Sequence, residues 1–367
     1  MPVHQLLAKR MPVASNPADF VTMRDYSENS AMQNFAAFLL SKMIEKNAER
    51  LFSADSTSKV VKVVDYGCAT GSSSLDPLRA IQAAAGSNRR VLAVMNDLAL
   101  NDWGTLKQTL KENVPDVDVQ IASQSMYKDV VAEKGSVHIG FSCFAQHWLS
   151  RGVPCPLPIE TGALWGNQLA GLPKHKAIYD QWSKESRKDW ERFLELRAAE
   201  LQSGGVLVLL IQSALLDGTM NDDLADGCQE AKKQCLEEGI FTVQEALAMC
   251  MPEYCKNIIE ILEPLQSEDS ELSRKWNVLE CQQLPLYALA DHQPDLANGH
   301  MSSRERAKNT INRAKSFMNA SLEQAFKKED REEKLGKFWK KVLEIGEAKS
   351  SGIDTNSEGT LLALERR

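Results

Sequence analysis

The 367-residue sequence lacks the patterns that mark several large classes of protein. None of its eight cysteines has C-x-x-C spacing and its six histidines complete no zinc pattern, so we expect neither structural zinc nor a disulfide framework. The net charge of −7 provides no basic surface for nucleic acid. No apolar run approaches the roughly 20 residues that cross a membrane, and no secretion-signal pattern opens the chain. We therefore expect a cytoplasmic protein that binds neither nucleic acid nor membrane.

Apolar runs and amphipathic stretches alternate along the first part of the chain. The run at residues 60–66 is near-continuous, which predicts a strand buried on both faces, and the stretches between the runs have helical spacing. The strands are expected at residues 60–66, 90–96, 117–123, 137–143 and 204–211, and the helices at 27–50, 74–85, 103–113 and 182–201. This alternation predicts an α/β fold with a doubly wound, mostly parallel, Rossmann-like sheet.

The remaining segments are predicted to cover this sheet. We interpret residues 51–215 as a ligand-binding α/β core, with a Pro- and Gly-rich cap insertion at about 150–180. Residues 216–345 contain long amphipathic, charged stretches and are predicted to form a mainly helical substrate-binding cap. Residues 1–50 are expected to form a segment and helix that close over the ligand. Residues 346–367 are expected to form a loop and a possible final edge strand.

A glycine-rich turn after the first expected strand is the strongest sign of a ligand. Asp65, Gly67 and Gly71 lie where the strand becomes a helix, which is where doubly wound sheets bind ligands. The turn has neither the G-x-G-x-x-G of nicotinamide enzymes nor the lysine of a P-loop. An acid before the turn suits a positively charged group such as an α-amino group. Asp97, at the tip of the second strand, can accept hydrogen bonds from ribose hydroxyls, so the two acids together indicate S-adenosylmethionine.

Four separated motifs resemble those of a known family. They are Y-S-E-N-S-A-M-Q at residues 26–33, D-Y-G-C-A-T-G at 65–71, N-D-L-A-L-N-D-W at 96–103 and F-S-C-F-A-Q-H-W-L-S-R-G-V-P at 141–154. In their order and approximate spacing they resemble the SABATH carboxyl methyltransferases, named after salicylate, benzoate and theobromine. The resemblance implies the fold of class I methyltransferases and S-adenosylmethionine as the cofactor.

The resemblance also implies roles for individual residues. Asp65 and Gly67 would hold the methionine end of the cofactor, and Asp97 would hold its ribose. The other residues expected at the cofactor are Tyr26, Ser30, Gln33, Cys68, Ser73, Leu98, Ser125 and Met126. The acceptor carboxylate would be held by Gln33 and Trp148, in a substrate pocket that also contains Phe144 and His147.

These residue types suit methyl transfer to a carboxylate. A carboxylate with a pKa of about 4 is already ionised at neutral pH, so the nucleophile needs no general base. The amide of Gln33 and the indole N–H of Trp148 are neutral donors, which orient one oxygen without neutralising its charge. We therefore expect catalysis by positioning alone, which can supply roughly 7–11 kcal/mol. The apolar side chains nearby favour an aromatic or lipophilic acid as the substrate.

The sequence leaves other interpretations open. His147 is compatible with N-methylation of a small heterocycle, and Ser72-Ser73, where the family has Pro-Asn, is compatible with a non-catalytic scaffold that binds the cofactor. A nicotinamide oxidoreductase is disfavoured by the missing glycine motif. We expect no metal, because Asn167 alone matches a metal-binding position of the family. The resemblance, with apolar residues between 317 and 338, favours a homodimer.

Overall fold

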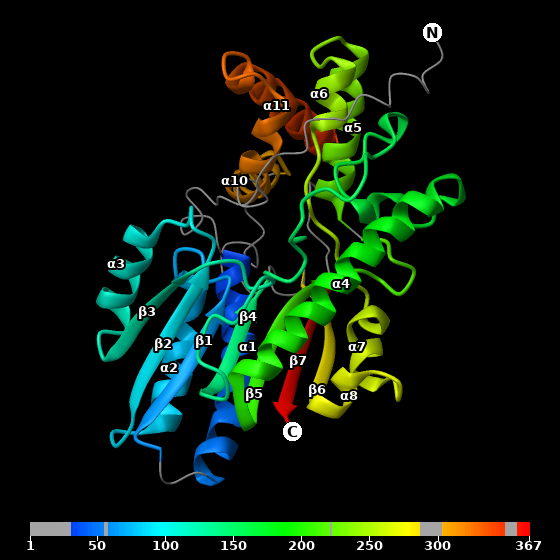
Figure 1. Cartoon of the computed structure of the whole chain (residues 1–367). Helices are drawn as coiled ribbons and strands as arrows, with labels where there is room; N and C mark the ends of the chain where they lie inside the picture. Colours follow the sequence, from blue (N-terminus) through cyan, green and yellow to red (C-terminus); the bar gives the residue numbers. More distant parts are fainter. Residues whose placement is uncertain (1–30, 55–57, 221, 287–302, 349–357) are drawn as a thin grey trace.

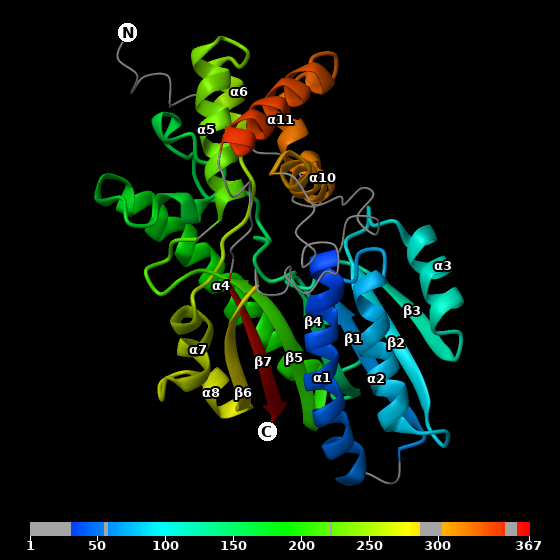
Figure 2. The ribbon, with the colours of Figure 1, turned by 180° about the vertical axis from the view of Figure 1, so that it is seen from behind.

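The computed structural model describes residues 31–54, 58–220, 222–286, 303–348 and 358–367, without the side chains of residues 31–35, 303 and 306. Within these residues the chain forms a seven-stranded sheet with helices on both faces and a group of helices at one end (Figures 1 and 2). The predicted α/β class, the doubly wound, mostly parallel sheet and the helical cap are therefore confirmed.

The strands of the sheet are in the order β3-β2-β1-β4-β5-β7-β6. Five of them are parallel: β1 (Val60–Tyr66), β2 (Arg90–Asp97), β3 (Val117–Ser123), β4 (Val137–Cys143) and β5 (Leu201–Ser213). The other two, β6 (Trp276–Pro285) and β7 (Glu358–Arg366), are antiparallel to their neighbours. After β3 the chain passes back over β2 and β1 to form β4 on the other side of β1, so the strand order reverses between β1 and β4. Sheets of this kind bind ligands at the carboxyl ends of the strands that flank such a reversal.

Helices cover both faces of the sheet because successive side chains of its central strands point to opposite faces and both sets are apolar. On one face, Val63 and Val208 belong to the core formed with α1 (Ala31–Ala54), α2 (Leu75–Ala85) and α3 (Trp103–Asn113). On the other face, Val64 and Leu209 belong to the core formed with α4 (Lys176–Glu200), α7 (Ile258–Gln266) and α8 (Glu271–Lys275).

The cap lies at the carboxyl ends of the parallel strands and has a hydrophobic core of its own (Figure 1). Its helices are α5 (Asp223–Glu237), α6 (Val243–Ala248), α10 (Ser303–Leu322) and α11 (Arg331–Ala348). Short 3₁₀ turns occur at Ser72–Ser74, Ile159–Thr161, Gly166–Leu169, Pro173–His175 and Glu323–Ala325. The apolar side chains considered for a subunit interface belong to the cap core or pack against it: Phe317, Leu322, Phe326 and Phe338. They therefore give no support to a homodimer.

Two strands occupy places that the sequence pattern does not predict. β6 lies within residues 216–345, the predicted cap, but forms an edge of the sheet with mostly half-buried side chains. An edge strand packed on one face has no long apolar run, which is why its sequence does not suggest a buried strand. β7, predicted as an edge strand, instead lies between β5 and β6, and its central residues are buried.

Two boundaries also differ from the prediction. Gly204 and Gly205, expected as a turn that opens a strand, lie inside β5, whose pairing with β4 is irregular in this region. A Cβ atom on Gly205 would lie 2.9 Å from the carbonyl oxygen of Gln202, so the close backbone approach at this irregularity requires glycine. α4 begins at Lys176, earlier than predicted.

Candidate active site

The loop between β1 and α2 lies directly against the loop that follows β4. Gly67 and Gly71 have φ angles of 85° and 84°, which glycine adopts without strain. A Cβ atom on Gly67 would also lie 2.5 Å from the Cβ of Ala145, so the contact between the two loops requires glycine there. Ala69 and Phe144 have φ angles of 45° and 55°, an uncommon conformation for residues with side chains. Backbone strain of this kind concentrates at ligand-binding loops.

The tip of β2 fixes the shape of the glycine-rich loop. The carbonyl oxygen of Asn96 accepts hydrogen bonds from the N–H groups of Gly67 and Cys68, at 2.8 and 3.0 Å. The carboxylate of Asp97 accepts from the N–H of Ala69 at 2.7 Å, and the side chain of Asn101 donates to the carbonyl of Ala69 at 2.7 Å. The motif around Asp97 therefore holds the loop through its backbone.

Two acids at this end of the sheet, the buried Asp65 and the half-buried Asp97, differ in their surroundings. Burial raises the pKa of Asp65 to about 7, although Ser74 donates a hydrogen bond to its carboxylate. Burial also raises the pKa of Asp97, against the opposing effect of the N–H groups of Ala69 and Leu98. A carboxylate has about four lone-pair directions, so Asp97 keeps capacity for further donors.

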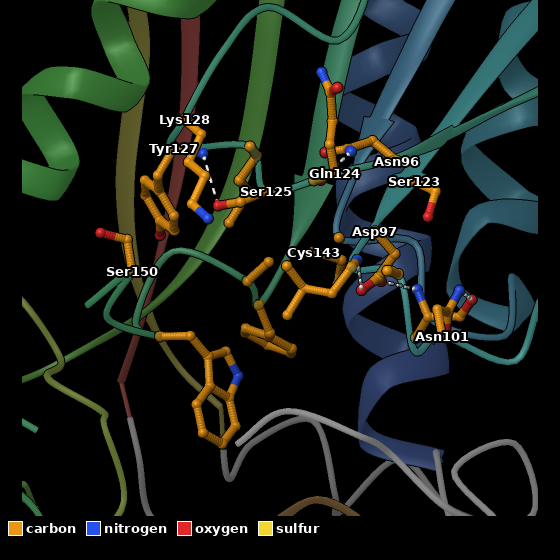
Figure 3. A pocket seen from close by; sticks show the side chains of 18 of the residues that line it. Asn96, Asp97, Asn101, Ser123, Gln124, Ser125, Tyr127, Lys128, Cys143 and Ser150 are labelled. Atoms are coloured by element: carbon orange, nitrogen blue, oxygen red, sulfur yellow. Dashed lines mark hydrogen bonds between the residues drawn. The ribbon is translucent and has the colours of Figure 1, made fainter. Parts of the chain in front are cut away.

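A cavity of about 350 Å³ lies between these loops at the carboxyl ends of the parallel strands. Several residues predicted from the sequence line it: Gly67, Ser73, Asp97, Leu98, Ser125, Met126, Phe144 and Trp148. Figure 3 shows Asp97 and Asn101 on one side of the cavity and Ser125, Tyr127 and Lys128 on another.

The remaining predicted residues either do not line the cavity or have side chains that the structure does not describe. Tyr26 and Ser30 lie outside the described residues, and Gln33 lies in α1 but its side chain is not described. Three others are buried without lining the cavity: Asp65, Cys68 and His147. Sequence reasoning also missed several wall residues, among them Asn101, Tyr127, Lys128, Cys143 and Ser150. Asn101 belongs to the motif around Asp97, and Tyr127 and Lys128 directly follow Met126, so adjacency to predicted residues was the available signal.

A buried ion pair on α4 fixes the part of the wall that contains Met126. Arg197 and Glu200 are both fully buried, with Nε and Oε2 3.0 Å apart. Arg197 donates to the carbonyl of Met126 at 3.0 Å and to that of Asp129 at 3.3 Å. Glu200 accepts from the N–H of Val131. The pair therefore holds both ends of the segment from 126 to 131.

The loop after β4 contains buried polar atoms that have no hydrogen-bond partner among the described residues. They are both amide atoms of Gln146, Nδ1 of His147 and the indole Nε1 of Trp148. Burial and the charge of Lys256 lower the pKa of His147 to about 3, so its imidazole is neutral at physiological pH. An unsatisfied buried polar group costs roughly 1–3 kcal/mol, and each such group calls for an explanation. For Trp148, which lines the cavity, a bound ligand is the simplest one.

Asn167 has a structural role in the cap. Its side-chain amide donates to the carbonyls of Gly218 and Cys255, at 3.0 and 2.9 Å, and accepts from the N–H of Cys255 at 2.8 Å. In the part of the chain that the structure describes, no three His, Cys, Asp or Glu side chains are grouped to hold a metal ion. Among the helices described, none combines the length and apolarity needed to cross a bilayer.

Comparisons with known proteins agree on one family. The profile described as "SAM dependent carboxyl methyltransferase" matches residues 22–365. The chain is 27% identical over 263 residues to methyltransferase FUS9 of Gibberella fujikuroi, covering 69% of this chain and 67% of that protein. It is 26% identical over 268 residues to a salicylate/benzoate carboxyl methyltransferase of Arabidopsis thaliana, covering 67% and 68% of the two chains. A solved structure, loganic acid methyltransferase with SAH, has the same fold, with a TM-score of 0.75 and 18% identity over 95% of this chain and 98% of that one.

Proposed function

Since the chain belongs to the family of S-adenosylmethionine-dependent carboxyl methyltransferases, we propose that it converts a small-molecule carboxylic acid to its methyl ester without a general base. One observation carries the proposal. Trp148 lines the same cavity as Asp97, is 7% exposed, and its indole N–H has no partner among the described residues. A neutral, buried donor at this place suits one oxygen of an acceptor carboxylate.

The wall of the cavity fits S-adenosylmethionine. Its volume of about 350 Å³ lies within the range of small-molecule sites. Asp97 retains lone pairs for ribose hydroxyls, and Leu98 and Met126 offer apolar contacts to a purine. Gly67 contributes only backbone atoms to the wall of the cavity. When bound, the cofactor supplies an electrophilic methyl group.

The residues of the chain act by orienting the acceptor. Trp148 and, as the resemblance implies, Gln33 donate to one carboxylate oxygen, which leaves the other oxygen free to attack. The acceptor is already ionised, so no residue needs to remove a proton. His147 is neutral and therefore does not form an ion pair with the nucleophile. Buried Phe144 adds an apolar wall, which favours an aromatic or lipophilic acid.

Three further parts of the proposal rest on the resemblance. The part of residues 1–50 that contains Tyr26, Ser30 and Gln33 closes over the cofactor, whereas the rest of α1 covers a face of the sheet. Asp65 and Cys68 support the methionine end of the cofactor from behind the wall. The protein acts in the cytoplasm, in keeping with eight cysteines that form no disulfide. It forms a homodimer, which light scattering would report as twice the chain mass of 40.8 kDa.

A methyl-transfer assay tests the activity. Methyl-labelled S-adenosylmethionine is incubated with the protein and a pool of aromatic, indolic, terpenoid and fatty acids, and purine and pyridine acceptors form a second pool. We expect label in a base-labile product of the acid pool. Label from the second pool alone would replace carboxyl methylation by N-methylation. Cofactor binding by calorimetry without any label would favour a non-catalytic scaffold.

A further inference from the structure

A short segment of the cap, residues 251–255, pairs with the loop that contains Trp148. The N–H of Leu149 donates to the carbonyl of Pro252 at 2.8 Å, and the N–H of Tyr254 donates to the carbonyl of His147 at 2.9 Å. These two hydrogen bonds flank an antiparallel bridge between Trp148 and Glu253. The cap therefore contributes Glu253 directly opposite the residue proposed to hold the acceptor carboxylate.

The geometry of this bridge brings the two side chains together. The flanking hydrogen bonds make Trp148 and Glu253 a non-hydrogen-bonded pair, the type in which antiparallel partners lie closest. Directly opposite residues also point to the same side of the pair, with Cβ atoms roughly 4.5–5.5 Å apart. The side chain of Glu253 therefore starts beside that of Trp148, next to the wall of the cavity that Trp148 lines.

The surroundings leave the carboxyl group of Glu253 with little to bind. It is 5% exposed, and its closest polar contact among the described residues is the thiol of Cys255, with Sγ 3.7 Å from Oε1. Lys256, the neighbouring cation in the sequence, instead donates to the carbonyl of Gln146 and the hydroxyl of Ser186.

Charge also favours the neutral form of Glu253. Burial, followed by the charge of Asp222, raises the pKa of Glu253 to about 8. A protonated carboxyl group does not repel a carboxylate beside it, and it can both donate and accept a hydrogen bond.

We propose that Glu253 is a specificity-determining residue, which hydrogen-bonds to a hydroxyl or N–H group that the acceptor acid carries near the carboxylate held by Trp148. This inference rests on the proposed function. An acid without such a group leaves the buried carboxyl group of Glu253 with the thiol of Cys255, a weak donor, as its hydrogen-bond partner. We expect this mismatch to weaken binding by roughly 10- to 100-fold.

Matched pairs of acids test the inference by binding, independently of turnover. Calorimetry measures their affinities for the protein saturated with S-adenosylhomocysteine. One pair is 3-hydroxybenzoic and 3-methylbenzoic acid, which tests a hydroxyl group. The other is indole-3-acetic and 1-naphthylacetic acid, which tests an N–H group. In at least one pair, the wild-type protein should bind the donor-bearing acid roughly 10- to 100-fold more tightly.

Variants then assign the preference to Glu253. Glu253→Met should reduce the ratio within the responsive pair to less than about threefold, because its side chain accepts no comparable hydrogen bond. Glu253→Gln should keep most of the ratio, because an amide still donates and accepts. Glu263→Gln, a change at an exposed carboxylate of α7, is the matched control and should leave the ratio unchanged.

The outcomes separate this inference from the proposed function. A wild-type protein with no preference in either pair, or an unchanged ratio in Glu253→Met, overturns the role of Glu253 even if acids are methylated. If Glu253→Met fails to fold, the affinity ratios of the wild type and of Glu253→Gln still test the inference. If no acid of the panel binds and no base-labile label forms, the proposed function fails first and this inference fails with it.

Discussion

The two halves of the proposed site differ in how far the protein satisfies its own polar groups. In the cofactor half, made of the β1–α2 loop, the tip of β2 and residues 125–131, Asp97 and Asn101 bind the backbone of the loop beside them. Arg197 and Glu200 bind the backbone on the opposite side. Among the described residues, the cofactor half leaves one buried side-chain polar atom without a partner, the hydroxyl of Tyr127. The acceptor half, made of residues 144–150 and 251–255, leaves four: both amide atoms of Gln146, Nδ1 of His147 and the indole Nε1 of Trp148.

This difference indicates whether the protein or the ligand supplies the hydrogen-bond partners in each half. A half whose hydrogen bonds are already formed is preorganised, so little ordering is needed when its ligand binds. The other half has hydrogen-bonding capacity that the chain itself does not use, and its ligand must supply the partners. The first arrangement suits a cofactor shared by a family, and the second suits an acceptor that differs between members.

The largest effect is expected from breaking the wall of the cofactor half. Arg197→Met leaves the carboxylate of Glu200 buried without its ion-pair partner, which should lower the free energy of unfolding by about 3–5 kcal/mol. Urea denaturation measures this change. Arg187→Met, on the same helix but with an exposed ion pair, is the control and should cost about 1 kcal/mol or less. Similar losses in both variants would mean that the buried pair does not hold residues 126–131.

Removing the acid at the tip of β2 tests cofactor recognition itself. Asp97→Ala loses both the support of Ala69 and the proposed bonds to the ribose, so the Kd for S-adenosylhomocysteine should rise by about 100-fold or more. Calorimetry provides the measurement. Asp102→Ala removes a nearby acid that caps α3, and should cost about 1 kcal/mol of stability with no change in Kd. A rise of less than about threefold for Asp97→Ala would exclude its role at the ribose.

A change at Trp148 should separate the two halves. Trp148→Phe removes the indole N–H but keeps an aromatic ring, so kcat should fall by roughly 10- to 100-fold while the Kd for S-adenosylhomocysteine changes less than about twofold. Trp165→Phe is a matched control, because Trp165 is also buried with an unpartnered indole N–H in the described structure but does not line the cavity. Equal losses in both variants would point to cap packing instead of carboxylate positioning.

The sequence predicted the cofactor half better than the acceptor half for a physical reason. β1, β2 and β4 are short, mostly buried strands, and their apolar runs end at the residues that build the site. The glycine-rich loop needs glycine for its φ angle and for its contact with Ala145, and both needs are visible as glycine in the sequence.

The contacts that sequence reasoning missed join distant segments. Arg197 reads as an ordinary charge in a helix, and only the packing of α4 places it against the carbonyl of Met126, 71 residues away. The place of Glu253 opposite Trp148 depends on a single bridge that no periodicity indicates. β6 was missed because an edge strand has no apolar run to mark it.

The smallest effect is expected from protonation in the acceptor half. The pKa of Glu253 is raised to about 8 from a model-peptide value of 4.5, so the folded chain keeps a proton that the unfolded chain loses as the pH rises between these values. Its contribution to stability is therefore full below about pH 4.5 and is lost as the pH rises through about 8. Glu253→Gln has no such proton, so its free energy of unfolding should increase relative to that of the wild type by at least about 1 kcal/mol between about pH 5 and pH 8.5.

Urea denaturation of both proteins at the two pH values measures this gain. Asp65 also has a raised pKa, but it is present in both proteins and cancels in the difference. The charge of Asp222 acts on Glu253 itself, so its influence is part of the measured effect. A constant difference between the variant and the wild type would mean that Glu253 is ionised in the folded chain throughout this range. The acceptor half would then carry a negative charge beside Trp148, and a cationic or neutral acceptor would fit it better than a carboxylate.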